Sequence, residues 1–237
     1  MAYGFNGSNQ YLQRTDTCGI SGTGFSIGCW FKTPSSNADF IFGLCDSASY
    51  SQFLLYDNGN RYLYAYEAGT AAVASAQFSN GTWHHALGVS IHNTSRAVYL
   101  DGANKGTSGG ATSVWPGPTL TEVAHRTKNN NYWAGQVAWA SIWNAVLTDA
   151  DAAALGKGIH PTLVKPQNLV AFWPLGGLDP QDPKDRWGGY DLTAYNSPTE
   201  EEHPAGLLYP QGPQIVAPGT APPASSVPWH LMIGSAV

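Results

Sequence analysis

Charged residues are scarce in this sequence, and their scarcity argues against several kinds of fold. Asp, Glu, Lys and Arg together make up 11% of the 237 residues, whereas about 25% is typical of soluble globular proteins. Exposed helices depend on these residue types for their solvent faces, so the composition disfavours a mainly helical protein. The polar residues are instead Ser, Thr, Asn, Gln and Gly, which suit short strands joined by many turns.

A basic surface and a long hydrophobic run are also missing, and this limits the partners. The formal net charge is −5, so the chain lacks the broad basic surface expected of a nucleic-acid-binding protein. No apolar run approaches the roughly 18–20 residues that span a bilayer, so we expect no membrane insertion. Met1–Phe5 leads directly into a strand-like pattern without a basic start, so we expect no signal peptide and synthesis in the cytoplasm.

Cysteine is rare as well, and its three positions match no zinc or redox motif. Cys18, Cys29 and Cys45 are an odd number, and the last two lie within apolar segments. This pattern favours buried free thiols. One disulfide bond, with the third thiol left over, remains the alternative.

Short segments typical of strands recur along the chain, separated by Gly, Asn, Asp and Pro. Asn58-Gly59 and Asp101-Gly102 predict hairpin turns, because these residues tolerate the positive φ angles that such turns require. About a dozen strands without intervening helices predict an all-β, two-sheet antiparallel sandwich or jelly roll. The main expected strands are Gln10–Arg14, Phe25–Lys32, Asp39–Cys45, Gln52–Tyr56, Arg61–Tyr66, Thr70–Gln77, Thr82–Ile91, Arg96–Leu100, Thr119–His125 and Tyr132–Trp143, with a loop at Gly106–Ser113.

The part of the chain after Trp143 divides into three expected segments. Thr148–Gly156 predicts one short helix, with Thr148 as its N-cap and acidic residues in its first turn. Residues 165–196 return to strand character, so we assign residues 1–203 to one domain. Residues 204–237 contain no Asp, Glu, Lys or Arg and are interrupted by prolines. Such a segment cannot build its own core, and it predicts an extended C-terminal arm.

Several motifs resemble laminin-G-like domains of the concanavalin A-like lectin and glucanase superfamily. They follow the order of that family over about residues 1–160, and the resemblance implies a jelly-roll fold. The matching segments are Phe25–Lys32, Gly81–His85, Arg96–Gly102 and Trp133–Asn144. The continuation is similar to a subgroup common in phage and prophage-like genes, through Leu169–Leu175, Tyr190–Thr193, Ser197–Thr199 and His203-Pro204.

The same superfamily contains glycoside hydrolases, so catalytic residues have to be considered. The resemblance implies that such enzymes carry their two carboxylates on an E-x-D-x-E strand, and no such strand exists here. Glu200–Glu202 are adjacent and are expected to lie in a loop flanked by prolines. His84 and His85 are neighbours on an expected strand and therefore point to opposite faces, so they cannot bind one metal ion together. We therefore predict a protein that is not an enzyme.

The resemblance implies calcium as a candidate cofactor at the rim of the sandwich. Asp46 is the first candidate ligand, followed by Asp57 and Asn58, because calcium prefers carboxylate and amide oxygens. The alternative is that these residues only stabilise turns.

Aromatic residues in loops are candidates for sugar binding. Trp115 lies in an expected loop, and Tyr132 and Trp133 follow three consecutive asparagines. The alternative is that these rings fold back and cap the sandwich.

Two functions are consistent with these observations. The first is a phage virion structural or decoration protein, located in the virion and displaying the jelly-roll domain. Its arm would dock on capsid subunits or on another copy through the apolar residues Trp229, Leu231, Met232 and Ile233. The alternative is a carbohydrate-binding, lectin-like adhesion module with glycan partners. The arm has its own alternative, which is to fold back and cover a sheet edge.

Overall fold

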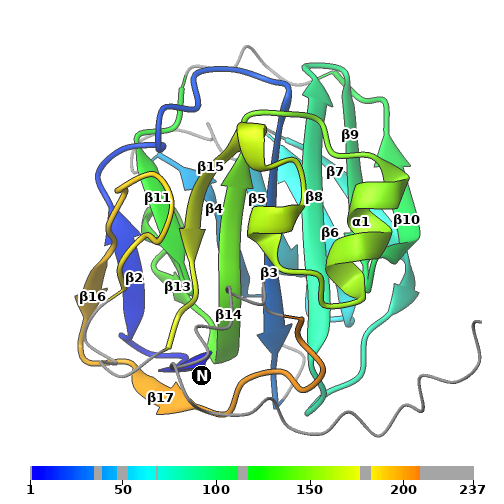
Figure 1. Ribbon diagram of the computed structural model, residues 1–237. Coiled ribbons are helices and arrows are strands. Elements are labelled where there is room, and N and C mark those ends of the chain that lie inside the picture. Colours follow the sequence, from blue (N-terminus) through cyan, green and yellow to red (C-terminus); the bar gives the residue numbers. More distant parts are fainter. Residues whose placement is uncertain are drawn as a thin grey trace, which may run out of the picture.

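The computed structural model describes residues 2–34, 39–46, 53–67, 69–111, 117–176 and 183–208. Two antiparallel sheets pack face to face, and one short helix lies outside the first of them (Figure 1). The predicted all-β jelly-roll sandwich is therefore confirmed. No helix in the described ranges is long and apolar enough to cross a membrane.

The first sheet has eight strands, and its centre is β14 (Ala134–Trp143). On one side β14 pairs with β3, and on the other it pairs with β1 along its first half and with β15 along its second half. The order along the main path is β10–β9–β8–β3–β14–β1–β17. The remaining bounds are β1 (Ala2–Asn6), β3 (Phe25–Lys32), β8 (His84–His92), β9 (Ser95–Leu100), β10 (Ala103–Ser108), β15 (Leu169–Trp173) and β17 (Thr199–Glu201).

The second sheet has seven strands in the order β16–β2–β11–β4–β5–β6–β7. A separate two-stranded ribbon, β12 (His125–Arg126) with β13 (Asn131–Tyr132), contacts β4 of this sheet and encloses the 3-10 turn η1 (Thr127–Asn129). The bounds are β2 (Tyr11–Arg14), β4 (Phe40–Cys45), β5 (Phe53–Asp57), β6 (Tyr62–Glu67), β7 (Thr70–Gln77), β11 (Leu120–Val123) and β16 (Thr193–Tyr195).

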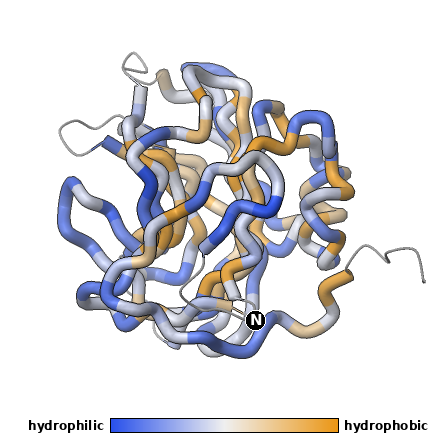
Figure 2. The backbone as a smooth tube through the Cα atoms, turned by 60° about the vertical axis from the view of Figure 1, so that its left-hand side comes forward, coloured by the Kyte–Doolittle hydropathy of each residue, from blue (hydrophilic) through white to orange (hydrophobic). Residues whose placement is uncertain are grey.

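The main core lies between the two sheets, and a second cluster lies under the helix. In β3, Phe25, Ile27, Cys29 and Phe31 all face the main core, as the alternation of the sequence predicts. The opposite face of the first sheet is covered by α1 (Asp149–Gly156) and the segments around it, which form the second cluster. Figure 2 shows the hydrophilic stretches gathered in the peripheral loops. Both faces of the first sheet are thus buried where the helix lies.

The predicted turn and helix signals are present. Asp101 and Gly102 both have positive φ angles, 55° and 71°, and they connect β9 to β10. Thr148 caps α1, since its side chain accepts a hydrogen bond from the Asp151 N–H and the Asp151 side chain accepts one from the Thr148 N–H. The three cysteines are buried and free, as the sequence indicates.

Strand β10 was not expected, because its sequence, Ala103–Ser108, has the composition of a loop. It forms the edge of the first sheet and packs against β7 at the edge of the second. A Cβ atom at Gly106 would lie 1.7 Å from the carbonyl oxygen of Val73. Only glycine at this position allows the two sheet edges to approach this closely. Packing against β7, rather than the local sequence, therefore explains why this segment is a strand.

The chain after the helix contributes strands to both sheets. Strand β15 joins the first sheet, β16 joins the second, and β17 returns to the first beside β1. The expectation of a loop is wrong for Glu200 and Glu201, because both lie in β17 and pair with β1. Beyond β17 the structure describes the chain as far as Leu208, whose N–H donates to the Gly158 carbonyl at 2.7 Å. The rest of the predicted arm lies outside the described residues, including Trp229, Leu231, Met232 and Ile233.

Candidate functional site

The outward face of the second sheet carries a group of tyrosines. Leu55 in β5 and Leu63 and Ala65 in β6 face the main core, so the alternate residues Tyr56, Tyr64 and Tyr66 point away from it. The ring centroids of Tyr56 and Tyr64 are 5.0 Å apart, and those of Tyr56 and Tyr66 are 6.0 Å apart with the ring planes at 85°. All three rings are half-buried, which leaves part of each ring accessible.

The ribbon β12–β13 is anchored on the same face by a buried carboxylate. Glu122 is fully buried and accepts hydrogen bonds from the Thr127 N–H at 3.1 Å and from the Gln13 side chain at 2.7 Å. His125 Nδ1 lies 3.1 Å from the same carboxylate. Burial alone would raise the pKa of Glu122, but hydrogen bonds from His125, Thr127 and Gln13 outweigh it and lower the pKa. The carboxylate therefore stays ionised at neutral pH and holds the ribbon in place.

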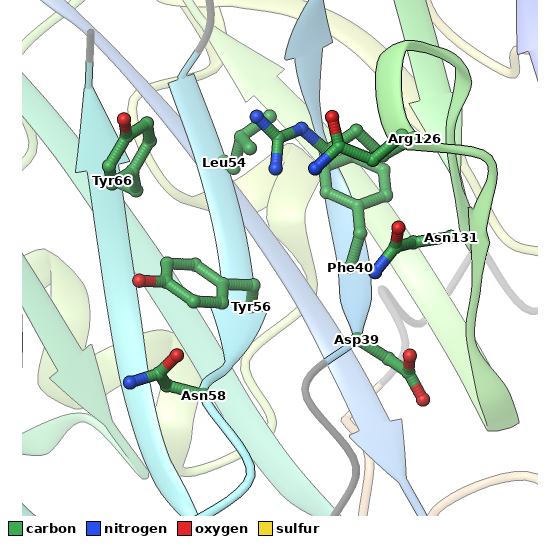
Figure 3. A pocket seen from close by; sticks show the side chains of 9 residues that line it. Asp39, Phe40, Leu54, Tyr56, Asn58, Tyr66, Arg126 and Asn131 are labelled. Carbon is green, nitrogen blue, oxygen red and sulfur yellow. The ribbon is translucent and has the colours of Figure 1, made fainter. Parts of the chain in front are cut away.

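A pocket of about 320 Å³ opens between the tyrosines and the ribbon (Figure 3). Its apolar lining consists of Phe40 and Leu54, which are each 2% exposed and belong to a small cluster on this face of the sheet. Tyr66 packs against that cluster, and Tyr56 lines the pocket beside it. The pocket therefore combines an apolar floor with aromatic walls.

The polar groups of the pocket lie at its two ends. Asp39 and Asn58 lie at one end, and Arg126 extends from the ribbon at the other, beside Leu54 (Figure 3). Burial raises the pKa of Asp39. Burial also raises the pKa of Tyr56 to about 12, so its hydroxyl remains a hydrogen-bond donor at neutral pH. Two further amides, Asn129 and Asn131, complete the lining on the side of the ribbon.

Asp57 stabilises the turn that carries Asn58. Its side chain is fully buried, and Oδ1 accepts hydrogen bonds from the N–H groups of Gly59 at 3.1 Å and Arg61 at 3.0 Å. Oδ2 is buried without a hydrogen-bond partner among the described residues. Burial is the main cause that raises the pKa of Asp57 to about 6.

The structure separates the expected calcium ligands. The Asp57 N–H donates to the Asp39 carbonyl at the beginning of β4, whereas Asp46 follows the end of that strand. Six strand residues of about 3.3 Å each place Asp46 on the order of 20 Å from Asp57. Asp46 and Asp57 are therefore too far apart to bind one ion together, and calcium binding at Asp46, or at Asp57 and Asn58, stays a prediction. Within the described ranges, no group of three His, Cys, Asp or Glu side chains is arranged to hold a metal.

The expected sugar-binding aromatics also fall in different places. Trp133 is 1% exposed and packs against Phe31 in the main core, with ring centroids 6.1 Å apart. It follows the alternative in which the ring folds back onto the sandwich, and it is too buried to bind a sugar. Tyr132 stays partly exposed on the ribbon, where it stacks on His125 at 4.6 Å outside the pocket lining. Trp115 lies outside the described residues.

His84 and His85 point to opposite sides of β8, as expected. His84 Nδ1 lies 2.8 Å from Asp101 Oδ2, and the His85 N–H donates to Asp101 Oδ1 at 2.9 Å. His85 packs against Trp30 on the other face, where burial lowers its pKa to about 4. These contacts hold the β9–β10 turn against β8, which agrees with a structural role for the pair.

Sequence reasoning missed Tyr56, Tyr66 and Arg126 as pocket residues. The alternation of tyrosines at positions 62, 64 and 66 was visible as a strand signal. However, the residues between the tyrosines are apolar or small, so periodicity alone does not say which face is outward. Arg126 gave no local signal at all, because it joins the pocket through the folding of the ribbon.

A laminin-G-type family model, described as the concanavalin A-like lectin/glucanases superfamily, matches residues 6–153, more than half of the chain. The chain belongs to this superfamily. Its laminin-G-like domain therefore includes every strand from β2 to β14 and the beginning of α1. No curated protein matches the sequence.

Solved structures resemble this laminin-G-like protein at low sequence identity. A candidate carbohydrate-binding protein from Bacteroides ovatus superposes with a TM-score of 0.64 and 15% identity, over 87% of this chain and 61% of that one. A heptameric SAP-like pentraxin from Limulus polyphemus gives 0.54 and 16%, over 65% and 81%. The CBM40 domain of a Ruminococcus gnavus IT-sialidase, bound to α2,3-sialyllactose, gives 0.52 and 12%, over 65% and 96%. At these identities the similarities establish the fold alone.

Proposed function

We propose that this laminin-G-like protein is a carbohydrate-binding module and that the pocket between the tyrosines and the ribbon is its sugar site. The observation that carries the proposal is the outward pair Tyr56 and Tyr66 over an apolar floor, with hydrogen-bonding side chains at both ends. The carbohydrate-binding structures that share the fold support this class of function.

The chemistry of the pocket suits a sugar ring. A pyranose has an apolar face of C–H groups that packs on an aromatic ring, and a rim of hydroxyls that need donors and acceptors. Tyr56 and Tyr66 provide the rings, while Asp39 and the Asn58 amide provide acceptors and a donor for hydroxyls. The pocket is lined from four separate chain segments, so the folded sheet and the ribbon pre-organise it for binding.

Catalysis is not part of the proposal. The superfamily includes both lectins and glucanases, so the fold alone does not decide between binding and catalysis. Of the two carboxylates near the pocket, Asp39 lines one end, whereas Asp57 is buried and accepts hydrogen bonds from the adjoining turn. We propose that the module binds a glycan without cleaving it.

The location in a virion and the docking of the arm on capsid subunits or on a second copy remain predictions. They are compatible with sugar binding, because an adhesive particle presents its binding domain outward. Their support is the uncharged, proline-rich composition of residues 204–237 and the resemblance to the phage subgroup.

A glycan array followed by titration calorimetry tests the proposed site. Tyr66→Ala is expected to lower the affinity for any glycan found by about tenfold, because it removes a stacking surface. Tyr62→Ala is the matched control, since Tyr62 is also a half-buried tyrosine of β6 but lies outside the pocket lining. Binding that is unchanged in Tyr66→Ala and in Tyr56→Ala, or the absence of any glycan ligand, would refute the proposal.

A further inference from the structure

We propose that the glycan recognised by this pocket carries a carboxylate and that Arg126 binds that carboxylate. The inference rests on the proposed function and specifies its substrate class as acidic sugars. Uronic acid residues within a chain and terminal sialic acids share this chemistry.

Arg126 is the cationic side chain in the described lining of the pocket. It reaches from β12 to a position beside Leu54 and Phe40, both of which are almost fully buried (Figure 3). The apolar surroundings reduce the screening of its charge by water. A planar guanidinium matches the two oxygens of a carboxylate with two parallel hydrogen bonds, which gives both affinity and orientation.

The backbone that carries Arg126 is held on both sides. The residue before it, His125, and the residue after it, Thr127, both bind the buried Glu122 carboxylate. Arg126 also pairs with Asn131 across the ribbon. A cation presented from such a constrained backbone loses less entropy when it binds a ligand.

The opposite end of the pocket determines which kind of acidic ligand is accepted. The Asp39 carboxylate can accept hydrogen bonds from hydroxyls, and the Asn58 amide can both accept and donate them. A second negative group near Asp39 would be repelled. A ligand with a carboxylate at one end and hydroxyls at the other satisfies both ends. A sugar acid has this arrangement, whereas a densely charged polyanion places a negative group beside Asp39.

Calorimetry with matched pairs of ligands tests the inference. The first pair is a disaccharide of glucuronic acid linked to a neutral sugar and its carboxyl-reduced form, which have the same linkage but differ by a single carboxylate. The second pair is 3′-sialyllactose and lactose. We expect the wild-type protein to bind the acidic member of at least one pair at least about tenfold more tightly, and the pair that responds identifies a uronic acid or a sialic acid ligand.

Substitutions in the ribbon test whether Arg126 causes the preference for the acidic ligand. Arg126→Gln is expected to lower the affinity for the acidic ligand by about 10- to 100-fold and to change the affinity for its neutral counterpart by less than about twofold. Lys128→Gln is the matched control, because it removes the same charge from the same ribbon at a position outside the pocket lining. Arg126→Lys keeps the charge without the two-pronged geometry and should give an intermediate affinity. If Arg126→Gln does not fold, Arg126→Lys provides the test.

Two results overturn the inference while the proposed function stands. One is equal affinity of the wild-type protein for the acidic and neutral members of both pairs, with binding still lost in Tyr66→Ala. The other is an equal loss in Lys128→Gln and Arg126→Gln, which would indicate a general effect of charge. If no glycan of any kind binds, the proposed function itself fails.

Discussion

Glu67 and Arg96 form an ion pair in the interior between the two sheets. Glu67 ends β6 in the second sheet, Arg96 lies in β9 of the first, and the distance from Arg96 Nε to Glu67 Oε2 is 3.0 Å. Both side chains are fully buried. The Ser90 hydroxyl donates to Glu67 at 3.1 Å, and Arg96 Nη2 donates to the Gly110 carbonyl at 2.8 Å. The pair therefore joins both sheets at the edge where β10 meets β7.

Removing one partner of this pair should be costly. Arg96→Met leaves the Glu67 carboxylate buried without its counter-ion, which is expected to lower the free energy of unfolding by about 3–5 kcal/mol. The double variant with Glu67→Leu should recover most of that loss, because no uncompensated charge remains. Urea unfolding of the two single variants and the double variant measures the coupling. A loss below about 1 kcal/mol in Arg96→Met would show that the charge is not buried as described.

Asp57 should make stability depend on pH between about 4 and 6. Burial raises its pKa to about 6 in the folded chain, from 3.8 for the free side chain. In this window the folded chain holds a proton that the unfolded chain has released, so the free energy of unfolding falls as the pH rises. The stabilisation is complete below about pH 4 and lost above about pH 6. The total is about 3 kcal/mol, at about 1.4 kcal/mol per pH unit.

Asp57→Asn is the variant that tests this dependence. Its side-chain oxygen can still accept from the N–H groups of Gly59 and Arg61, but the side chain no longer titrates. We expect the variant to lack this component of the pH dependence and to be more stable than the wild-type protein at pH 7. Guanidinium unfolding at pH 4, 5, 6 and 7 provides the comparison. Parallel curves for the two proteins across this range would contradict the assignment.

Glu122 should control ligand affinity without contacting the ligand. Glu122→Ala removes the acceptor that anchors Thr127 and His125, so the ribbon should open more often and become a site of proteolytic cleavage. We expect glycan affinity to fall by about 3- to 10-fold and stability to fall by about 1–3 kcal/mol. Glu200→Gln, at an exposed position in β17, is the control. Unchanged proteolysis and affinity in Glu122→Ala would show that the ribbon holds its position without this anchor.

Two C-terminal truncations, one after Leu208 and one after Gly206, separate the part of the arm that packs on the domain from the part beyond it. Leu207 packs against the cluster under α1, and the Leu208 N–H binds the Gly158 carbonyl. A chain that ends after Leu208 should keep its melting temperature, whereas one that ends after Gly206 should melt lower. If the arm is a docking device, the chain ending at Leu208 should also lose its oligomeric state or its attachment to particles. A large fall in melting temperature without any change in assembly would show that the arm packs on its own domain.

Local patterns determined most of the secondary structure. The bounds of Phe25–Lys32, the Thr148 helix cap and the Asp101-Gly102 turn follow from side-chain alternation, capping chemistry and positive φ angles. Each of these depends on residues that are near one another in the sequence. The fold class follows from their number and order, and the family resemblance agreed with it.

Tertiary structure decided the site and the exceptions. Trp133 entered the core while Tyr66 faced outward, because pairing between distant strands sets which face of each strand is buried. Asp46 and Asp57 are separated by the length of β4, although each lies at the end of a strand, Asp46 directly after β4 and Asp57 as the last residue of β5. Glu67 and Arg96 are 29 residues apart in the sequence, and only the packing of the two sheets brings them together and buries them. Sequence patterns carry no information about such distances, since the contacts form between segments far apart in the chain.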